Sequence, residues 1–357
     1  MIDVVEPDDY DESPSDSELE LFDPTEYQIT PYREMPRQVT PSFFLLHYID
    51  FVCMVIANGK PSQDTIRTYK ENIGRFLNWC MKKSRMSPFK LTETHLEIYR
   101  AMLYQKTSVK GTAYDDNSIH LHFVAIRAFY KAAMKHKLIG YNPAENIKVK
   151  CVYINDRAFV YYTMEEIRHI VEYVRANLPK LDALRNLVCI YLMSVAGLRC
   201  VEVQRANRED INWSNSTMVI HGKGHDGIVY LEPTTVGIIR EYLECLDKQP
   251  FKIHSANGAT PLIVTSASNR CGTRLDRQTI RWNTNRILSA LGMKTKGASC
   301  HVFRHSCATA LYKNTRDLRV VQETLRHRSP EITARYAHVV ERMESRPTTA
   351  LGKMLEF

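Results

Sequence analysis

Helical periodicity dominates this chain and is interrupted by one pair of short strand-like runs, so the possible folds are mainly helical ones with a small sheet. Beyond residue 40, apolar residues recur at three- and four-residue intervals. Gly, Pro and Asn steps separate the periodic segments. The expected amphipathic helices of the first half span about 41–57, 62–83, 92–106 and 116–138. They predict a helical N-terminal domain.

The helical pattern stops in the segment 140–150, which contains an Asn-Pro step followed by basic residues. Because the residue before a proline disfavours the helical region, this segment predicts a linker. A second domain is expected from about Asp156. Its first helix is predicted to follow Thr163, a suitable N-cap, with Glu165 and Glu166 in the first turn, where acidic side chains suit the helix dipole.

The strand-like runs lie within this second domain. Met218–His221 and Gly227–Glu232 flank a Gly-Lys-Gly-containing turn and predict a β-hairpin. Helices are expected at about 182–196, 233–247, 276–291, 301–313, 316–325 and 330–345. The predicted fold class is therefore mainly α, of the α+β type, with a small antiparallel sheet in the second domain. The predicted parts are an acidic tail at 1–40, a helical domain at 41–148, a second domain at 156–345 and a C-terminal tail at 346–357.

Charge is distributed unevenly along the chain. Residues 1–30 contain eleven acidic side chains and no Lys or Arg, which predicts a disordered acidic tail. The remainder holds 48 basic against 40 − 11 = 29 acidic residues, a net charge of +19. Such an excess favours a polyanionic partner, because Lys and Arg contacts to phosphate release condensed counterions. Basic surfaces also serve solubility or membrane contact, so charge alone does not identify the partner. The tail either competes with DNA for the basic surface or has no role.

Two features restrict the compartment. No stretch approaches the roughly 18 uninterrupted apolar residues of a membrane span, and the N-terminus lacks the basic-then-apolar order of a secretory signal. We therefore expect a cytoplasmic protein without membrane contact. The nine cysteines are odd in number and contain no C-x-x-C pair, which favours reduced, mostly buried thiols over zinc or redox sites.

The helix at 301–313 carries the first candidate site residues. His301 and Arg304 lie on one face with the small Ala308, where they can grip one phosphate near the amide donors of the helix start. An ordinary amphipathic helix with a polar outer face is the alternative. His301 and His305 also have the i, i+4 spacing of a metal pair, but the acid between them in metalloproteases is missing, so no metal is predicted.

The segment Ala196-Gly197-Leu198-Arg199 precedes another candidate. Gly197 ends one helix and lets the next begin beside Arg199, near amides that favour anions. Glu202 can orient Arg199 from three residues on, and a surface Arg–Glu pair is the alternative.

The third candidate segment includes residues 325–336. Ser-Pro-Glu at 329–331 supplies the cap, first-position proline and acidic first turn of a helix start. Tyr336 then lies nearly two turns inside that helix, and His327 lies just before it. On spacing alone, a tyrosine at this place is more often a packed aromatic. In the first half of the chain, the helix at 116–138 offers Arg127, Lys131 and Lys135 as a face that can lie along a DNA backbone.

Together these segments resemble the tyrosine recombinase, or phage integrase, family. The pattern is A-G-L-R-x-x-E at 196–202, a hairpin lysine at Lys223, H-x-x-R-H at 301–305, and L-x-H at 325–327 with Tyr336 nine residues after the histidine. The resemblance covers roughly residues 41–340 and is strongest in the C-terminal half. Gly-Lys-Gly is also a common exposed turn, so Lys223 is the least specific part of the match.

The resemblance implies a role for each matching residue. Arg199 and Arg304 would clamp the scissile phosphate, His301 and His327 would donate hydrogen bonds or shuttle protons, Lys223 would protonate the leaving 5′-oxygen, and Tyr336 would be the nucleophile, with Glu202 and His305 in support. A phenol with a pKa near 10 is a poor nucleophile, and dense positive charge would favour its phenolate. These groups would do what a metal does in other phosphoryl transfers, so no metal or cofactor is expected.

The implied activity is site-specific recombination of double-stranded DNA through a 3′-phosphotyrosine intermediate, in integration, excision or resolution. The resemblance also implies a homotetramer on two DNA sites and a C-shaped clamp formed by the two domains. One alternative is a catalytically silent architectural protein of the same fold. The other is a type IB topoisomerase, a class that usually has lysine in place of the first histidine of H-x-x-R.

The chain departs from the family at Arg326, where glycine usually precedes the histidine. This arginine would either tighten phosphate binding or distort the turn. The residues up to Phe357 either dock on a neighbouring protomer or pack on their own chain.

Overall fold

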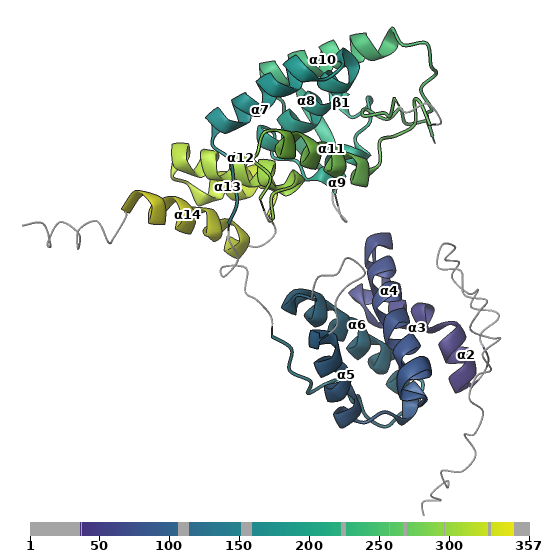
Figure 1. Cartoon of the computed structure of the whole chain (residues 1–357). Coiled ribbons are helices and arrows are strands. Elements are labelled where there is room, and N and C mark those ends of the chain that lie inside the picture. The colour runs from purple at the N-terminus through teal and green to yellow at the C-terminus, as the bar shows by residue number, and fades with distance from the viewer. Residues whose placement is uncertain are drawn as a thin grey trace, which may run out of the picture. The chain divides into compact units, whose positions relative to one another are not determined.

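The computed structural model describes residue 36 and the ranges 38–105, 114–150, 159–222, 226–256, 258–266, 270–295, 297–327 and 330–345, without the side chains of 332 and 342–345. The chain divides into two compact units, Met1–Asp156 and Arg157–Phe357 (Figure 1). Each unit is considered by itself. The predicted C-terminal tail and almost all of the predicted acidic tail lie outside the described residues.

The described part of the first unit is helical. Its α-helices are α2 (Pro41–Leu46), α3 (Tyr48–Val55), α4 (Gln63–Trp79), α5 (Glu93–Gln105) and α6 (Asp116–Lys135). Its short turns are the 3-10 helices η3 (Ala57–Gly59) and η5 (Pro88–Lys90) and the π-helical η4 (Cys80–Ser84). Side chains of Thr40, Ser62 and Asp115 cap α2, α4 and α6 as N-cap residues do. The first predicted helix is divided in two, because His47 leaves helical geometry at φ −114° and ψ 22°.

An aromatic core holds the first unit together. The α6 helix packs against α3 and α4, and it places Phe129 edge-on to Phe44, with ring centroids 5.4 Å apart. Phe44 in turn stacks on Phe51 at 4.9 Å. Such aromatic pairs each add about 1 kcal/mol beyond the burial of their surface. The first unit is therefore an independently packed helical domain.

The second unit contains more helices and one small sheet. Its elements are α7 (Met164–Asn177), α8 (Lys180–Ser194), α9 (Cys200–Arg205), β1 (Ile211–Asn212), β2 (Thr217–His221), β3 (Asp226–Tyr230), α10 (Pro233–Asp247), α11 (Arg277–Ala290), α12 (Cys300–Thr315), α13 (Leu318–Leu325) and α14 (Pro330–Ser345). The predicted start of α7 is confirmed, because Thr163 and Glu166 form a reciprocal capping box. The mainly helical fold class is confirmed as well.

The α8 helix is the centre of the second unit. It packs against α7, α10 and α12, and more weakly against α9 and α11 (Figure 1). Eleven of its residues are buried, on every side of the helix, and eight of these are apolar, as is typical of a helix in the middle of a domain. Because α9 follows α8 directly and α12 lies against it, the motifs at 196–202 and 301–305 are brought to the same core.

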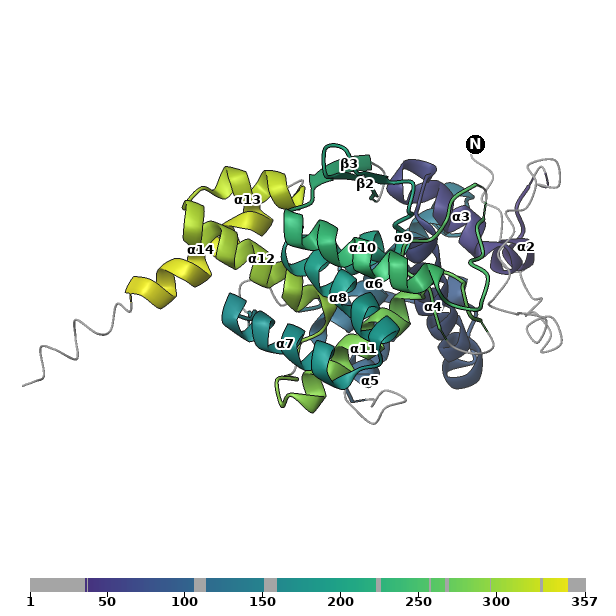
Figure 2. The ribbon, with the colours of Figure 1, turned by 90° about the horizontal axis from the view of Figure 1, so that it is seen from above.

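The sheet is an antiparallel meander in the order β1-β2-β3. Val219 pairs with Ile228, and His221 pairs with Asp226 at the end of the β2–β3 hairpin, which lies at the edge of the unit (Figure 2). The predicted hairpin is confirmed. The two-residue strand β1 was not predicted, because so short a run carries no periodicity. Lys223 lies in the turn, outside the described residues.

The described cysteines are all free thiols, as predicted. Six of them are buried, namely Cys53, Cys80, Cys189, Cys200, Cys300 and Cys307. Within the described ranges, no helix is long and apolar enough to cross a membrane.

Candidate active site

A buried carboxylate joins two arginines in the second unit and lies close to a third. Glu202 is 3% exposed. It accepts hydrogen bonds from the backbone N–H of Arg199 at 2.7 Å, from Nη1 of Arg199 at 2.8 Å and from Nη2 of Arg326 at 3.0 Å. Nη1 of Arg304 lies 3.9 Å away. Burial by itself raises the pKa of Glu202, but the Arg199 N–H and then the charges of Arg326 and Arg199 lower it by more. The carboxylate is therefore ionised, and the surface-pair alternative is wrong.

Gly197 makes the turn that places Arg199. Its φ is +66°, and an added Cβ would lie 2.7 Å from Cδ2 of Leu325. Glycine alone combines this left-handed backbone with so close a neighbour. The chain can then leave α8 and start α9 at Arg199, the N-cap. The prediction that Gly197 separates two helices beside Arg199 is confirmed.

Arg304 connects the separate motifs. It is 4% exposed, and its guanidinium donates to the carbonyl of Gly197 and, at 2.5 Å, to the carbonyl of Leu325. Burial, and then the charge of Arg199, lowers its pKa to about 10, so it stays charged at neutral pH. The alternative of a polar outer face on α12 is wrong, because Arg304 and Ala308 are both buried.

His301 lies at the start of the same helix and reaches solvent. Desolvation by the surrounding protein, followed by the charges of Arg304 and Arg281, lowers its pKa below the ordinary value of 6.5. It is therefore neutral at pH 7 and keeps one N–H donor.

Tyr336 lies in an aromatic cluster. Its side chain is only 2% exposed, and its hydroxyl is 3.1 Å from Nδ1 of His305. The ring of His327 lies parallel to it within 9°, with centroids 6.1 Å apart. Phe159 meets it edge-on at 5.6 Å. The packed-aromatic interpretation agrees with this burial, and the side chain also lies beside the candidate residues His305 and His327.

The net electrostatic effect on Tyr336 differs from the expectation. Burial raises the pKa of the phenol by more than Arg304, Arg335 and Arg199 lower it. The phenol is thus protonated at neutral pH in this conformation, and positive charge alone does not produce a phenolate.

His327 is held in one orientation. Its Nδ1 lies 3.0 Å from Oγ1 of Thr333, so Nε2 remains for other partners. Burial, followed by the charges of Arg304, Arg199 and Arg326, lowers its pKa to about 4. The histidine is neutral at pH 7 because burial and the charges of three nearby arginines both disfavour its protonated form.

The contacts that three residues make in this site were not predicted from the sequence. Thr333 is three residues before Tyr336 on the same helix, so helical spacing offers a signal for it. Phe159 is distant in sequence from α12 and α14 and offers none. Arg326 was noticed only as a departure from the family pattern, and its bond to Glu202 appears only in the tertiary structure.

The three predicted DNA-contacting residues of the first unit differ in their surroundings. Arg127 donates from Nε to the carbonyl of Ala144 at 3.0 Å and from Nη2 to that of Ile147 at 2.6 Å. It therefore holds the segment after α6 against the helix. Lys131 and Lys135 are exposed on the same helix.

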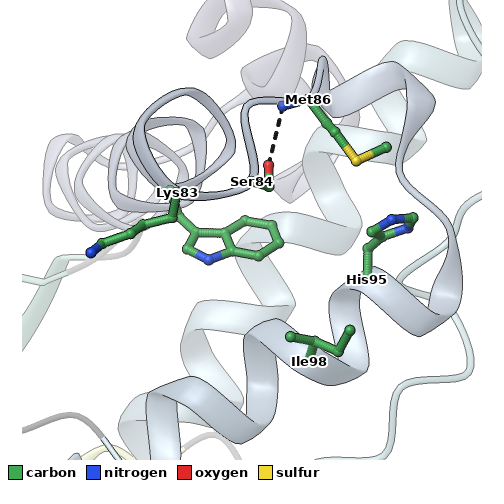
Figure 3. Close-up of a pocket in the computed structure, with 6 residues that line it drawn as sticks. Lys83, Ser84, Met86, His95 and Ile98 are labelled. Carbon is green, nitrogen blue, oxygen red and sulfur yellow. Dashed lines mark hydrogen bonds between the residues drawn. The ribbon is translucent and has the colours of Figure 1, made fainter.

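A hollow of about 280 Å³ lies in the first unit, and none of the predicted catalytic residues lines it. Lys83 and Ser84 of η4, Met86, and His95 and Ile98 of α5 line it together with Trp79 (Figure 3). Its walls hold no cluster of charges like the one around Glu202. Among the described residues, no group of three or more His, Cys, Asp or Glu is arranged to hold a metal ion.

Comparisons with known proteins identify the family of the chain. Residues 161–343 match the Phage integrase family, and residues 47–149 match the Phage integrase SAM-like domain. The chain is 25% identical over 279 residues to the tyrosine recombinase XerC of Leptospira interrogans, covering 78% of this chain and 84% of that protein. It is 27% identical over 285 residues to the tyrosine recombinase XerD of Staphylococcus saprophyticus, covering 78% and 88%.

Two solved structures share the fold. The XerH site-specific recombinase in a post-cleavage complex with palindromic difH substrate aligns with a TM-score of 0.61 at 21% identity, over 79% of each chain. A lambda integrase dimer bound to a COC′ core site aligns with a TM-score of 0.57 at 16% identity, over 80% of this chain and 95% of the other.

Proposed function

This chain belongs to the phage integrase family and is a tyrosine recombinase, and from that premise we propose that Tyr336 is its nucleophile. Arg199, His301, Arg304 and His327 form the phosphate site in this proposal. The observation that carries it is the position of Arg304, whose guanidinium bonds the carbonyls of Gly197 and Leu325. Three motifs separated in sequence thereby meet around one cluster of positive charge.

The proposed reaction is an in-line displacement at phosphorus. The Tyr336 oxygen attacks the scissile phosphate, the bond from phosphorus to the 5′-oxygen breaks, and a 3′-phosphotyrosine remains. The phenol proton passes to Nδ1 of His305, which lies 3.1 Å from the hydroxyl. Burial lowers the pKa of His305 to about 4, so the ring is neutral but a weak base, and it takes the proton only as the bond from the Tyr336 oxygen to phosphorus forms. Lys223 supplies the proton to the leaving 5′-oxygen. Attack by the 5′-hydroxyl of a second strand reverses these steps and needs no ATP.

Electrostatic stabilisation is the largest contribution of the protein in this proposal. The arginines keep their charges when buried, and charge developing on the phosphate oxygens is stabilised most strongly by donors that are already in place. His301 and His327 are neutral donors at pH 7, so they stabilise by hydrogen bonds and not by charge. The groups present supply what a metal supplies in other phosphoryl transfers.

The proposed substrate is double-stranded DNA. The net charge of +19 beyond residue 30 supports it, as do Lys131 and Lys135, which are exposed on α6 in the SAM-like domain. A homotetramer acting on two sites, in the cytoplasm, is part of the same proposal, with integration, excision or resolution as the outcome.

The alternatives are less well supported. A silent architectural protein has no need of Arg199, His301, Arg304, His327 and Tyr336 together. A type IB topoisomerase usually has lysine at the position of His301. Recombination of paired sites, as opposed to relaxation of one plasmid, separates the two activities.

The test is covalent trapping on a nicked suicide substrate. Tyr336→Phe is expected to abolish the protein–DNA adduct and to leave salt-dependent DNA binding nearly unchanged, because only the nucleophilic oxygen is removed. Tyr141→Phe, at a tyrosine that is 56% exposed in the first unit, is the matched control and should trap normally. An adduct formed by Tyr336→Phe would show that another residue attacks the phosphate.

A further inference from the structure

Arg326 occupies the turn between α13 and α14 in a conformation that suits glycine. Its φ is 56° and its ψ is 47°, in the left-handed region. A side chain there strains the backbone, and such strain persists where surrounding contacts hold it in place. Glycine, the usual residue of the family at this position, would remove the strain. The arginine therefore requires an explanation from its contacts.

The guanidinium of Arg326 reaches the buried carboxylate of the site. Nη1 donates to the carbonyl of Thr324 at 2.9 Å, and Nη2 donates to Oε2 of Glu202 at 3.0 Å. The same carboxylate oxygen accepts the backbone N–H of Arg199. Arg326 and Arg199 thus hold Glu202 from two sides, and only 21% of the Arg326 side chain is exposed. A charged hydrogen bond with so little solvent is stronger than a surface pair.

The aliphatic part of Arg326 lies against the β2–β3 hairpin. A Cβ added to Gly227 would be 3.1 Å from Cδ of Arg326, a tight contact that the arginine side chain could relieve only by moving a few tenths of an ångström. Gly227 belongs to β3, and the turn of this hairpin carries Lys223. One side chain therefore contacts α9 and β3 from the residue immediately before His327.

Arg326 also changes the charge balance of the cluster. Arg199, Arg304 and Arg326 face the single carboxylate of Glu202, which leaves two formal positive charges. With glycine at 326, one would remain. A phosphodiester carries one negative charge, and attack by a phenolate brings a second.

We propose that Arg326 is a positioning residue of the recombinase site, which fixes Glu202 against Arg199 and seats the β2–β3 hairpin beside the phosphate. This inference rests on the proposed function of the site. In this enzyme, a strained arginine takes the place of glycine because its contacts align the catalytic groups.

The decisive variant is Arg326→Gly. Glycine fits the left-handed turn, and the relief of backbone strain offsets part of the stability lost with the bond to Glu202, so the melting temperature should fall much less than in Glu202→Ala. Single-turnover cleavage of a suicide substrate at saturating DNA should nevertheless slow by at least about tenfold, with the Kd for DNA changed by less than about twofold. Arg326→Lys, which keeps the charge, should recover part of the rate.

Arg316→Gly is the matched control. Arg316 is likewise an arginine in a left-handed helix cap, with φ 56°, and it is exposed. Its replacement removes the same charge and the same backbone strain, so it should leave the cleavage rate unchanged. Combining Arg326→Gly with Glu202→Gln should slow cleavage by less than the product of the single effects, since both act on the same contact.

Three outcomes overturn the inference. Cleavage by Arg326→Gly at the wild-type rate shows that the arginine does not position the site. A loss confined to DNA affinity, with a shallower salt dependence, assigns it to phosphate binding instead. An equal loss of cleavage rate in Arg316→Gly shows that the effect comes from the overall charge of the protein and not from the position of Arg326. Failure of the proposed function looks different, because the wild-type chain itself would then form no covalent adduct.

Discussion

Each of the two units buries a histidine whose pKa is lowered to about 4, and the two sites differ in what surrounds the ring. In the first unit, His122 lies between neutral partners, with the Tyr99 hydroxyl 2.7 Å from Nε2 and the Asn72 amide oxygen 2.9 Å from Nδ1. Burial is the main cause of its low pKa, with a further contribution from Arg75. In the second unit, burial and three arginines act together on His327. The network around His122 provides hydrogen-bond partners for polar groups in a core. The cluster around His327 brings several positive charges together, as in a binding site for an anion.

The largest expected difference between the units concerns the loss of a buried polar side chain. Glu202→Ala leaves Arg199, Arg304 and Arg326 without their carboxylate, and breaking such a buried network costs about 3–5 kcal/mol of unfolding free energy. Asn72→Ala removes a neutral partner of His122 and should cost about 1–2 kcal/mol. Urea denaturation, followed separately for each unit, compares the two. Equal costs would contradict the distinction between a charged cluster and a neutral network.

A second prediction concerns acid. The folded pKa of His122 is about 4, below its ordinary value of 6.5, so its contribution to stability is complete above pH 6.5 and is lost as the pH falls toward 4. The loss amounts to about 3 kcal/mol at most.

The variant that tests it is His122→Gln, which cannot take up the proton. The slope of unfolding free energy against pH between 6.5 and 4 should become smaller for the first unit, as followed by the fluorescence of Trp79, which packs on Tyr99. The second unit should keep its slope, because His305 and His327 are unchanged. If the first unit kept its original slope, groups other than His122 would dominate its acid sensitivity.

The smallest predicted effect concerns DNA affinity in the first unit. Lys131→Ala and Lys135→Ala should each reduce the slope of log affinity against log salt by about one and weaken binding similarly for all sequences. Arg127→Ala should change that slope less and lower stability instead, because its guanidinium is bound to two carbonyls. Filter-binding titrations at several salt concentrations measure the slopes. An Arg127 effect as large as the lysine effects would show that it also contacts DNA.

Local sequence was sufficient for many helices. The bounds of α10 and α14 agree with the predicted 233–247 and 330–345, since Pro233 and Pro330 mark their first turns. The N-cap of α7 at Thr163 was also predicted correctly from the local sequence. The division of the first helix at His47 and the strand β1 were missed, because neither leaves a periodic signal in the sequence.

For the site, the sequence by itself determined the candidate residues and their spacing along the chain. It could do so because capping, helical spacing and the turn at Gly197 are local properties of the chain. Burial and partners depend on segments far apart, so only the tertiary structure decided them. The packing of the helices buries Arg304 of α12 and raises the pKa of Tyr336 by enclosing the phenol. It also brings Arg326 to Glu202, which is 124 residues away in the sequence. Charge, spacing and local conformation depend on residues that are neighbours in the sequence. Desolvation and long-range ion pairing arise only when the helices pack against one another.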